Sequence, residues 1–491
     1  MPHPEERNYV AIDLGAESGR VMVGTVGPDS LSLREMHRFS NRIQESALGL
    51  TWDFGGLIEE IEIGLRSVAR EGLAITSVSI DSWGVDYALT TDDRGWLEPV
   101  YAYRDGRSER GAKEALATLS WERLFDTTGI QYMAINSVFQ LRTEPAERLK
   151  QTDHVLGIAD AVARHLGARP ASERSLASTT QLYNPTTQDW AWDIIEELGY
   201  PRSIFPPIVD AGAEIGALAP ELQERTGLGS IPIIAGLSHD TAAAVAAVPA
   251  TDERWAYLSS GTWSLIGVEL EHPIINNTTR QHNYTNEIGW GGSVRLLQNI
   301  IGLWLAQELR REWTANGQNW DYQELTQMAL DAAPFRSLID PRDPRFLAPG
   351  GMESRIQDFL RESGQPTPDS PGAMMRCVFE SLALLYGEAM DAIEAITHWR
   401  PETLHIVGGG SQNDALNQWT ANATQRRVVA GPTEATAIGV VLAQAIASGQ
   451  LESLADARCL VLHATETKTF EPQDQERWTA ARARFRSLST A

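Results

Sequence analysis

The chain contains the same strand–turn–strand pattern twice, once near its start and once past its middle. The first copy runs from Tyr9 to Val26 and reads YVAID, then LGAESG, then RVMVGTV. The second runs from Trp255 to Leu270 and reads WAYLS, then SGT, then WSLIGVEL. Short apolar runs bounded by turn residues are typical of buried strands. A duplication of this kind predicts an α/β fold of two similar domains that face each other across a cleft.

The length of the chain agrees with two domains. Its 491 residues are more than one hydrophobic core usually serves. The polar stretch Pro249-Ala250-Thr251-Asp252 is turn-forming and stands directly before the second copy of the pattern. We therefore expect an N-terminal domain over residues 1–248 and a C-terminal domain over 249–491.

The stretch between the two copies places a carboxylate where a strand ends and a helix begins. The run IPIIAG (231–236) predicts a strand, and TAAAVAAV (241–248) predicts a helix. Asp240 lies between them, and an Asp at a helix start is usually a cap. The alternative is that Asp240 is a general base, with His239 beside it touching the substrate. A position between two duplicated hairpins favours the base, with Thr241 as the cap.

Two glycine-containing turns could hold phosphate groups. The turn LGAESG (14–19) can present successive N–H groups to a phosphate, and Asp13 before it can hold a hydrated Mg²⁺. An ordinary hairpin turn is the alternative. The strand LHIV (404–407) runs into three glycines, which let a ligand approach the backbone closely. The pattern is not GxGxxG, so a dinucleotide site is a poor fit.

Several polar or aromatic residues could contact a sugar. Trp83 and Gly84 follow the strand ITSVSID (75–81), and a buried core tryptophan is the alternative there. Asn136 could bind a sugar hydroxyl or cap a helix. The polar segment 178–182 could line a cleft or form a surface loop. Residues 296–310 carry apolar residues at helical spacing, which predicts a helix interrupted by Asn299 and Gln307.

The composition excludes some partners. A net charge of −24 repels nucleic-acid backbones. No apolar run reaches membrane-spanning length, and the first residues, MPHPEERNYVAID, lack a secretory apolar region. Two isolated cysteines do not make a disulfide framework. We expect a cytoplasmic protein that binds neither nucleic acid nor membranes.

The order of these motifs resembles the FGGY carbohydrate kinases, which have two actin-like (ribonuclease H-like) domains. DLGAESGR, SHDTA, SSGTWS and LHIVGGGSQN carry the resemblance, and it extends over nearly the whole chain. SHDTA and SSGTWSL, spaced as here, are specific, whereas a glycine run alone is not. Within the family, the motifs are most similar to those of members that phosphorylate the 1-hydroxyl of L-rhamnulose.

The resemblance implies a kinase that takes ATP, Mg²⁺ and a small sugar, as a monomer or homodimer. The N-terminal domain would bind sugar and phosphate, and the C-terminal domain would bind the nucleotide. Asp240 would be the base, Gly84 and His239 would contact the sugar with Trp83 and Asn136 nearby, and Asp13 would lie near the metal through water. The implied nucleotide contacts are Ala16, Glu17, Ser18, Gly19, Arg20, Thr262, Asn299, Gln307 and Gly409. Glu17 departs from the family, where small or hydroxyl residues are common, and its charge is unfavourable unless it points to solvent or Mg²⁺.

Three alternatives remain open at this stage. The sugar could be another ketose, such as L-fuculose or D-xylulose. The same fold also supports phosphohydrolases of the polyphosphate type. In a non-enzymatic role, the chain could be an actin-like nucleotide switch that binds a partner protein.

Overall fold

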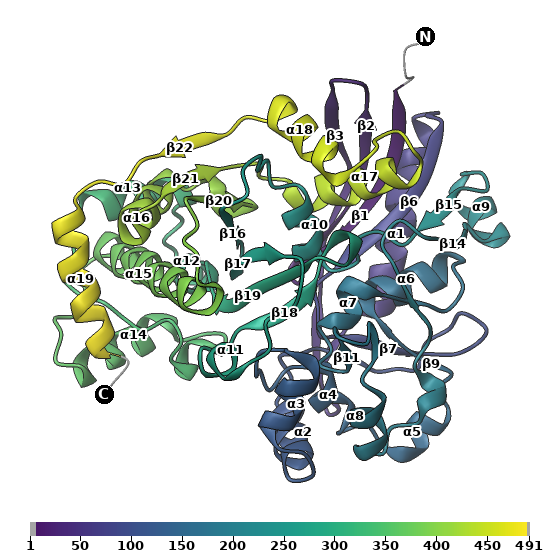
Figure 1. Ribbon diagram of the computed structural model, residues 1–491, viewed down its shortest axis with the longest axis horizontal. Helices are drawn as coiled ribbons and strands as arrows, with labels where there is room; N and C mark the ends of the chain where they lie inside the picture. Colours follow the sequence, from purple (N-terminus) through teal and green to yellow (C-terminus); the bar gives the residue numbers. More distant parts are fainter. Residues whose placement is uncertain (1–5, 489–491) are drawn as a thin grey trace. The chain divides into compact units, whose positions relative to one another are not determined.

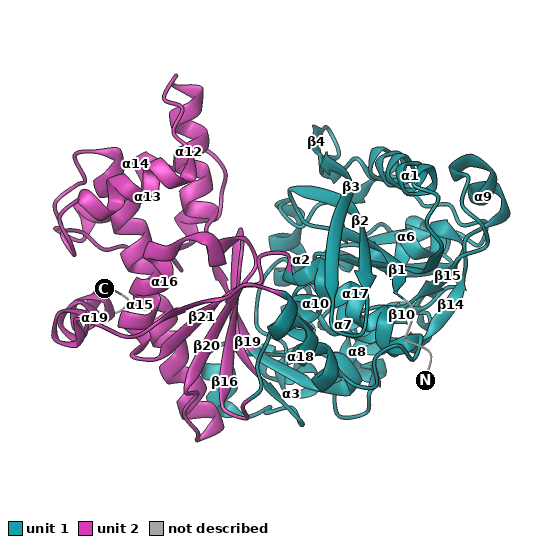
Figure 2. Ribbon diagram, turned by 90° about the horizontal axis from the view of Figure 1, so that it is seen from above, with its two compact units in different colours: residues 1–251, 269–296, 435–464 teal, residues 252–268, 297–434, 465–491 magenta. Residues whose placement is uncertain are grey.

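The protein forms two compact units in a computed structural model that describes residues 6–488. Within that range, unit 1 consists of residues up to 251, 269–296 and 435–464, and unit 2 of 252–268, 297–434 and the residues from 465 onward (Figure 2). The predicted boundary after residue 248 lies close to the first crossing between the units. Two segments of the predicted C-terminal domain, 269–296 and 435–464, are nevertheless part of unit 1.

Unit 1 is built on a six-stranded sheet in the order β14-β15-β6-β1-β2-β3. The strands are β1 (Arg7–Leu14), β2 (Ser18–Val26), β3 (Leu31–Ser40), β6 (Ile75–Ser82), β14 (Glu214–Ala217) and β15 (Pro232–Ile234). β1, β2 and β3 are antiparallel neighbours, whereas β6 runs parallel to β1 and to β15. The predicted hairpin of residues 9–26 and the predicted strands at 75–81 and 231–236 are confirmed.

Two helices from distant parts of the sequence pack together on this sheet. α10 (Asp240–Ala246) and α17 (Ala435–Ala447) both lie beside β1 in Figure 1. Gly439 makes their close contact possible, because a Cβ there would stand 1.9 Å from the backbone oxygen of Ala243. Gly24 on β2 likewise leaves room for Val441, whose Cγ2 would lie 2.3 Å from an added Cβ. This packing explains why residues 435–464 belong to unit 1.

Part of the remaining chain of unit 1 builds a separate apolar core around Phe139 and Ile194. The further strands are β4 (Ile43–Ser46), β5 (Gly49–Trp52), β7 (Tyr87–Thr90), β8 (Val100–Tyr101), β9 (His154–Gly157), β10 (Ser172–Glu173), β11 (Tyr183–Asn184), β12 (Asp189–Trp190), β13 (Ile208–Val209) and β18 (Thr285–Ile288). The further helices are α1 (Phe54–Arg70), α2 (Arg107–Leu116), α3 (Trp121–Thr128), α4 (Ser137–Leu141), α5 (Ala146–Lys150), α6 (Ile158–Leu166), α7 (Arg174–Ser178), α8 (Trp192–Glu197), α9 (Pro220–Thr226), α11 (Asn277–Gln281), α18 (Leu454–Ala464), and the 3₁₀ turns η1 (Arg202–Ile204) and η2 (Trp290–Gly292).

Unit 2 repeats the strand relationships of unit 1. The second sheet has the order β18-β19-β17-β16-β20-β21-β22. The new strands are β16 (Trp255–Ser260), β17 (Trp263–Leu270), β19 (Val294–Ile301), β20 (Thr403–Val407), β21 (Arg427–Ala430) and β22 (Lys468–Phe470). β16 is antiparallel to β17 and parallel to β20, just as β1 is antiparallel to β2 and parallel to β6. The predicted duplication is therefore confirmed at the level of strand topology.

The helices of unit 2 centre on α15 (Pro371–Thr397), which packs against α13 (Tyr322–Asp331) and α16 (Asp414–Thr424). The remaining helices are α12 (Trp304–Ala315), α14 (Met352–Glu362), α19 (Gln475–Leu488), and the 3₁₀ turns η3 (Pro344–Phe346) and η4 (Gly409–Gln412). Across residues 6–488, every helix is too short or too polar to cross a membrane.

The prediction of one helix over residues 296–310 was wrong. The first part of that range is the strand β19, and the helix α12 begins only at Trp304. Gly302 separates them: its amide donates to Thr262 O at 3.1 Å, and a Cβ there would collide with Ser264. A short run such as LLQNII has too few residues for its period to distinguish a buried strand from a helix.

Candidate functional site

In unit 1, polar residues gather at the carboxyl ends of three parallel strands. Asp13 lies at the end of β1, and Asp81 at the end of β6. Beyond β15, His239 continues alongside β6, where it forms an isolated parallel bridge with Ser82. Asp240 follows directly. In open α/β sheets this edge is where ligands bind, so the first candidate site is at this edge.

Asp13 and Asp81 lie side by side on the neighbouring strands β1 and β6. They are partners in the parallel register of β1 and β6, and both are buried. Within residues 6–488, neither carboxylate oxygen of Asp81 has a hydrogen-bond partner. Burial, and then the charges of Asp13 and Asp240, raise the pKa of Asp81 well above its ordinary value. Arg20, opposite Asp13 on β2, forms an ion pair with the Asp13 carboxylate.

The turn between β1 and β2 holds the predicted phosphate contacts. Gly15 N donates to Ser18 O at 2.9 Å, which leaves Ala16 and Glu17 at the tip. Glu17 is exposed, so its charge is not buried beside the turn. Gly19 is required by packing, because a Cβ there would stand 2.3 Å from the Phe39 ring. The turn therefore tolerates the departure from the family at Glu17.

Asp240 is the first residue of α10 and does not act as its cap. The N-cap residue is His239, whose side chain makes no capping bond. Asp240 Oδ1 accepts hydrogen bonds from Thr241 N at 2.5 Å and from Thr241 Oγ1 at 3.0 Å. The expectation that Thr241 caps the helix was therefore wrong. Oδ2 makes no hydrogen bond to any residue between 6 and 488, and the side chain is 32% exposed, so Oδ2 can meet a substrate hydroxyl.

His239 lies between Asp240 and a buried ion pair. Its Nε2 is 3.3 Å from Asp240 Oδ1. On the other side of the ring, Nδ1 is 3.3 Å from Oε2 of Glu287 on β18 and 3.1 Å from Nη2 of Arg295 on β19. Glu287 and Arg295 were not singled out in the sequence. The available signal was the charged Arg295 inside the apolar segment VRLL, whereas TNEI is mostly polar and does not set Glu287 apart.

A second buried acidic group fastens the loop that carries His239. Glu173 Oε2 accepts hydrogen bonds from Ser238 N at 3.1 Å and from Ser175 N at 3.0 Å. Ser175 Oγ in turn donates to Glu173 and accepts from His239 N at 3.2 Å. Burial raises the pKa of Glu173, and burial together with the Glu173 charge raises that of Asp160. These residues hold the backbone that leads into Asp240.

Trp83 belongs to the core rather than to an open surface. Its indole is buried, lies 4.5 Å from the Trp52 ring between ring centres, and donates from Nε1 to Asp86 Oδ2 at 2.9 Å. Asp86 also accepts from Trp52 Nε1, Tyr103 N and the Gln140 side chain. These contacts agree with the alternative of a buried core tryptophan, and a direct sugar contact by Trp83 stays a prediction.

Gly84 and Asn136 lie in a strained, buried part of unit 1. Val85, next to Gly84, has φ 65°, and Gln181 has φ 61°. A β-branched residue at positive φ is costly and is typical of functional sites. Asn136 Nδ2 donates to Gln131 O and Gln181 Oε1, each at 2.9 Å, while its Oδ1 has no partner within the described range. Because residues 178–182 are largely buried, the surface-loop alternative was wrong.

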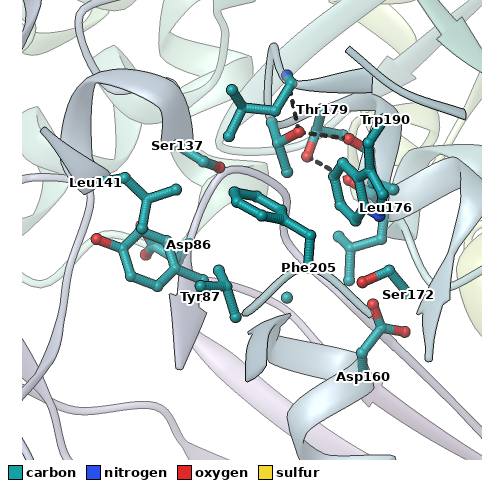
Figure 3. A pocket seen from close by; sticks show the side chains of 15 residues that line it. Asp86, Tyr87, Ser137, Leu141, Asp160, Ser172, Leu176, Thr179, Trp190 and Phe205 are labelled. Carbon is teal, nitrogen blue, oxygen red and sulfur yellow. Dashed lines mark hydrogen bonds between the residues drawn. The ribbon is translucent and has the colours of Figure 1, made fainter. Parts of the chain in front are cut away.

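A small cavity lies behind this strained segment. Asp86 and Tyr87 line one side and Asp160 and Ser172 another, with Thr179 above them (Figure 3). Its volume is about 20 Å³, which is room for roughly one water molecule. This volume is too small for a monosaccharide.

In unit 2, the corresponding edge of the sheet carries the predicted nucleotide contacts. Thr262 is in the turn after β16, and its carbonyl accepts the amides of Gly302 and Trp304, each at 3.1 Å. The glycines after β20 lie against the same turn, because a Cβ on Gly410 would stand 2.0 Å from Ser260 Oγ. Gly409 is exposed with open space around it.

The other two predicted nucleotide residues follow in the chain. Asn299 is half-buried on β19, whose final residues precede Gly302. Gln307 lies on the first turn of α12, and its Oε1 is buried without a partner among residues 6–488. Unit 2 thus brings the Thr262 turn, the glycine turn and the start of α12 together.

The carboxylates of unit 1 fit the way in which proteins hold Mg²⁺. Residues 6–488 contain no cluster of three or more acidic, His or Cys ligands that could enclose a metal ion. Mg²⁺ commonly keeps several waters and uses one or two carboxylates together with substrate phosphates. Asp13, with Asp81 beside it, supplies oxygen ligands of that kind.

Comparison with known proteins decides the family. Residues 8–246 match the N-terminal domain of the FGGY family of carbohydrate kinases, and residues 256–448 match its C-terminal domain. The chain belongs to this family. The family predicted from the sequence is confirmed, as is the α/β fold of two actin-like units.

Curated relatives of this FGGY kinase cover nearly all of its length. A rhamnulokinase of Bacteroides thetaiotaomicron is 43% identical over 485 residues, 98% of this chain and 99% of the relative. A rhamnulokinase of Bacillus subtilis is 38% identical over 471 residues, 96% of each chain.

Solved structures agree on the fold. A xylulose kinase from Lactobacillus acidophilus has a TM-score of 0.78 at 16% identity and covers 98% of this chain and 96% of its own. A glycerol kinase from Plasmodium falciparum with ADP has a TM-score of 0.77 at 14% identity, over 99% and 98% of the two chains.

Proposed function

We propose that the chain transfers the γ-phosphoryl group of ATP to the 1-hydroxyl of L-rhamnulose, giving L-rhamnulose 1-phosphate and ADP. The curated relatives support L-rhamnulose as the substrate, because rhamnulokinases among them are 35–43% identical over nearly the full chain. The observation that carries the chemistry is the open Oδ2 of Asp240, at the carboxyl ends of the parallel strands of unit 1.

Asp240 acts as the general base. Its Oδ1 is occupied by the two Thr241 donors, so Oδ2 receives the proton of the sugar hydroxyl. A carboxylate is a weak base, and it suffices because the hydroxyl becomes acidic only as its oxygen bonds to phosphorus. Phosphoryl transfer otherwise asks for alignment and for neutralisation of charge on the phosphates.

The remaining residues bind the two substrates and neutralise the charge of the phosphate groups. Residues 16–20, including the Arg20 guanidinium, hold the phosphates, and Asp13 holds Mg²⁺ through water. When bound, Mg²⁺ neutralises charge on the phosphate oxygens. The proposed nucleotide contacts of unit 2 are Thr262, Asn299, Gln307 and Gly409. The proposed sugar contacts are Gly84, His239, Trp83 and Asn136.

A coupled assay of ADP production tests the substrate. L-Rhamnulose, L-fuculose and D-xylulose are compared at equal concentration, with a reaction without sugar as the baseline. We expect the highest kcat/KM with L-rhamnulose and a negligible rate without sugar. A higher kcat/KM for another ketose would reassign the substrate, and sugar-independent phosphate release would indicate a phosphohydrolase.

We further propose that turnover requires Mg²⁺ and that the protein acts in the cytoplasm as a monomer or homodimer. The net charge of −24 supports small-molecule substrates and disfavours nucleic acid or anionic membranes. Titration of activity with Mg²⁺ after chelation checks the metal requirement, and light scattering of the purified protein checks the oligomeric state.

A further inference from the structure

We infer that Glu287 and Arg295 are positioning residues that hold His239 as the neutral tautomer protonated on Nε2, so that Nε2–H is presented to the sugar beside Asp240. The inference rests on the proposed function, because it assigns the form in which His239 meets the ketose. It adds two residues from β18 and β19, outside the loop that carries His239 and Asp240.

The ion pair between Arg295 and Glu287 is almost completely buried. The Arg295 side chain is 0% exposed, and that of Glu287 is 5% exposed. Their charges lie 3.2 Å apart, between Nη2 and Oε2. Arg295 Nε and Nη2 also donate to Ile288 O, at 3.2 and 3.1 Å. Buried charges are costly unless they are paired, so a pair held this firmly against a histidine ring needs an explanation.

The contact with Arg295 decides the tautomer of His239. A guanidinium group stays protonated and can only donate hydrogen bonds. Nη2 forms a hydrogen bond to Nδ1 at 3.1 Å, so Nδ1 has to be the acceptor. A proton on Nδ1 would bring two donors face to face. The ring proton is therefore on Nε2.

Glu287 completes the arrangement by balancing the charge. It offsets the positive charge of Arg295 at 3.2 Å, so that the guanidinium can stay buried and donate to Nδ1. Nε2 then faces the Asp240 carboxylate at 3.3 Å. A sugar hydroxyl near this edge can accept from Nε2–H while another donates to Asp240 Oδ2. The pair thus orients the ketose for the general base.

Kinetics of three variants test the positioning role. Glu287→Gln removes the charge with little change in shape, Arg295→Lys keeps the charge but loses the planar fork, and Glu269→Gln is a matched control. Glu269 pairs with Arg458 in the same unit and does not contact His239. We expect kcat/KM for L-rhamnulose to fall by about 10- to 100-fold in the first two. The KM for ATP should stay within about twofold, as should all constants of the control.

The tautomer is read directly by NMR with ¹⁵N-labelled histidine. The chain has 10 histidines, and the signals of His239 are those lost in His239→Gln. The wild-type protein should show an unprotonated Nδ1 and a protonated Nε2, and the pattern should change in Arg295→Lys. A protonated Nδ1 in the wild-type protein overturns the inference even if a variant fails to fold.

The outcomes separate the inference from the proposed function. If the wild-type protein does not phosphorylate L-rhamnulose, the proposed function fails, and the NMR result still decides the tautomer. If it does, but both variants keep wild-type constants for the ketose, Glu287 and Arg295 do not position the sugar contact. Equal losses for ATP and ketose would indicate a general structural defect instead.

Discussion

The hydroxyl of Ser175, in α7, accepts the backbone amide hydrogen of His239 at 3.2 Å. Because the same hydroxyl donates to the buried Glu173, it has one orientation and acts as a fixed acceptor. The loop before Asp240 is therefore held from outside by α7 and not by its own helix. Since Asp240 lacks a capping bond, this external support defines where its carboxylate lies.

Replacing Ser175 by alanine should loosen that support. The buried amide of His239 then loses its acceptor, and an unsatisfied buried donor costs about 1–3 kcal/mol. We expect the free energy of unfolding in urea to fall by that amount and kcat to fall, with the KM for ATP unchanged. Ser67→Ala is the control, because its hydroxyl bonds only within α1. Wild-type kcat in a destabilised Ser175→Ala protein would show that the loop is held by other contacts.

Replacing Asp240 by asparagine should remove the base and leave the fold intact. The amide oxygen of asparagine can still accept from Thr241 N and Oγ1, so α10 keeps its start. Removal of a positioned base typically costs about 10²–10⁴-fold in rate. We expect kcat to fall in that range, with ATP affinity by calorimetry and the melting temperature close to those of the wild-type protein. Near-wild-type turnover would refute the assignment of the base.

The sequence predicted the strands of this site better than its side-chain contacts. Repeated apolar runs and turns are local, so the hairpins at 9–26 and 255–270 could be recognised. The pairing of Glu287 with Arg295 depends on β18 and β19 being neighbours, which no local pattern shows. Trp83 illustrates the same limit, because only the fold reveals that its indole faces Asp86. The strand β19 was missed because the six residues of LLQNII (296–301) fit the period of a helix as well as that of a buried strand.

Asp160 should make stability depend on pH. Burial and the Glu173 charge raise its pKa well above the ordinary value, so the folded protein keeps this proton when the unfolded chain has lost it. As pH rises above about 4, the wild-type free energy of unfolding should therefore lose up to roughly 1.4 kcal/mol per pH unit from this group. The loss ends when pH passes the folded pKa.

Asp160→Asn should remove that dependence. Asparagine resembles the protonated acid and can still accept the hydrogen bond from Glu173 N. The stability of the variant relative to the wild-type protein should thus increase between pH 5 and 7.5 in urea titrations, while the exposed Asp29→Asn shows no such trend. A difference that stays constant with pH would mean that Asp160 is ionised in the folded protein.

Two neighbouring glycines after β20 should respond differently to the same substitution. A Cβ on Gly410 would stand 2.0 Å from Ser260 Oγ and 2.5 Å from Ser260 Cβ, so Gly410→Ala has to displace the turn after β16. Gly409 has open space around it, and alanine fits there. We expect Gly410→Ala to lower the melting temperature, and Gly409→Ala to keep it.

The proposed contact between Gly409 and ATP predicts a second effect, on the KM for ATP, for the Gly409→Ala variant. If Gly409 approaches ATP, the methyl group of Gly409→Ala should raise the KM for ATP several-fold without changing that for the ketose. Gly449→Ala, at an exposed turn with positive φ and open surroundings, is a control for the effect of an added methyl group on backbone strain. An unchanged KM for ATP in a stable Gly409→Ala protein would remove Gly409 from the nucleotide site and leave the glycine turn with a packing role alone, through Gly410 and Ser260.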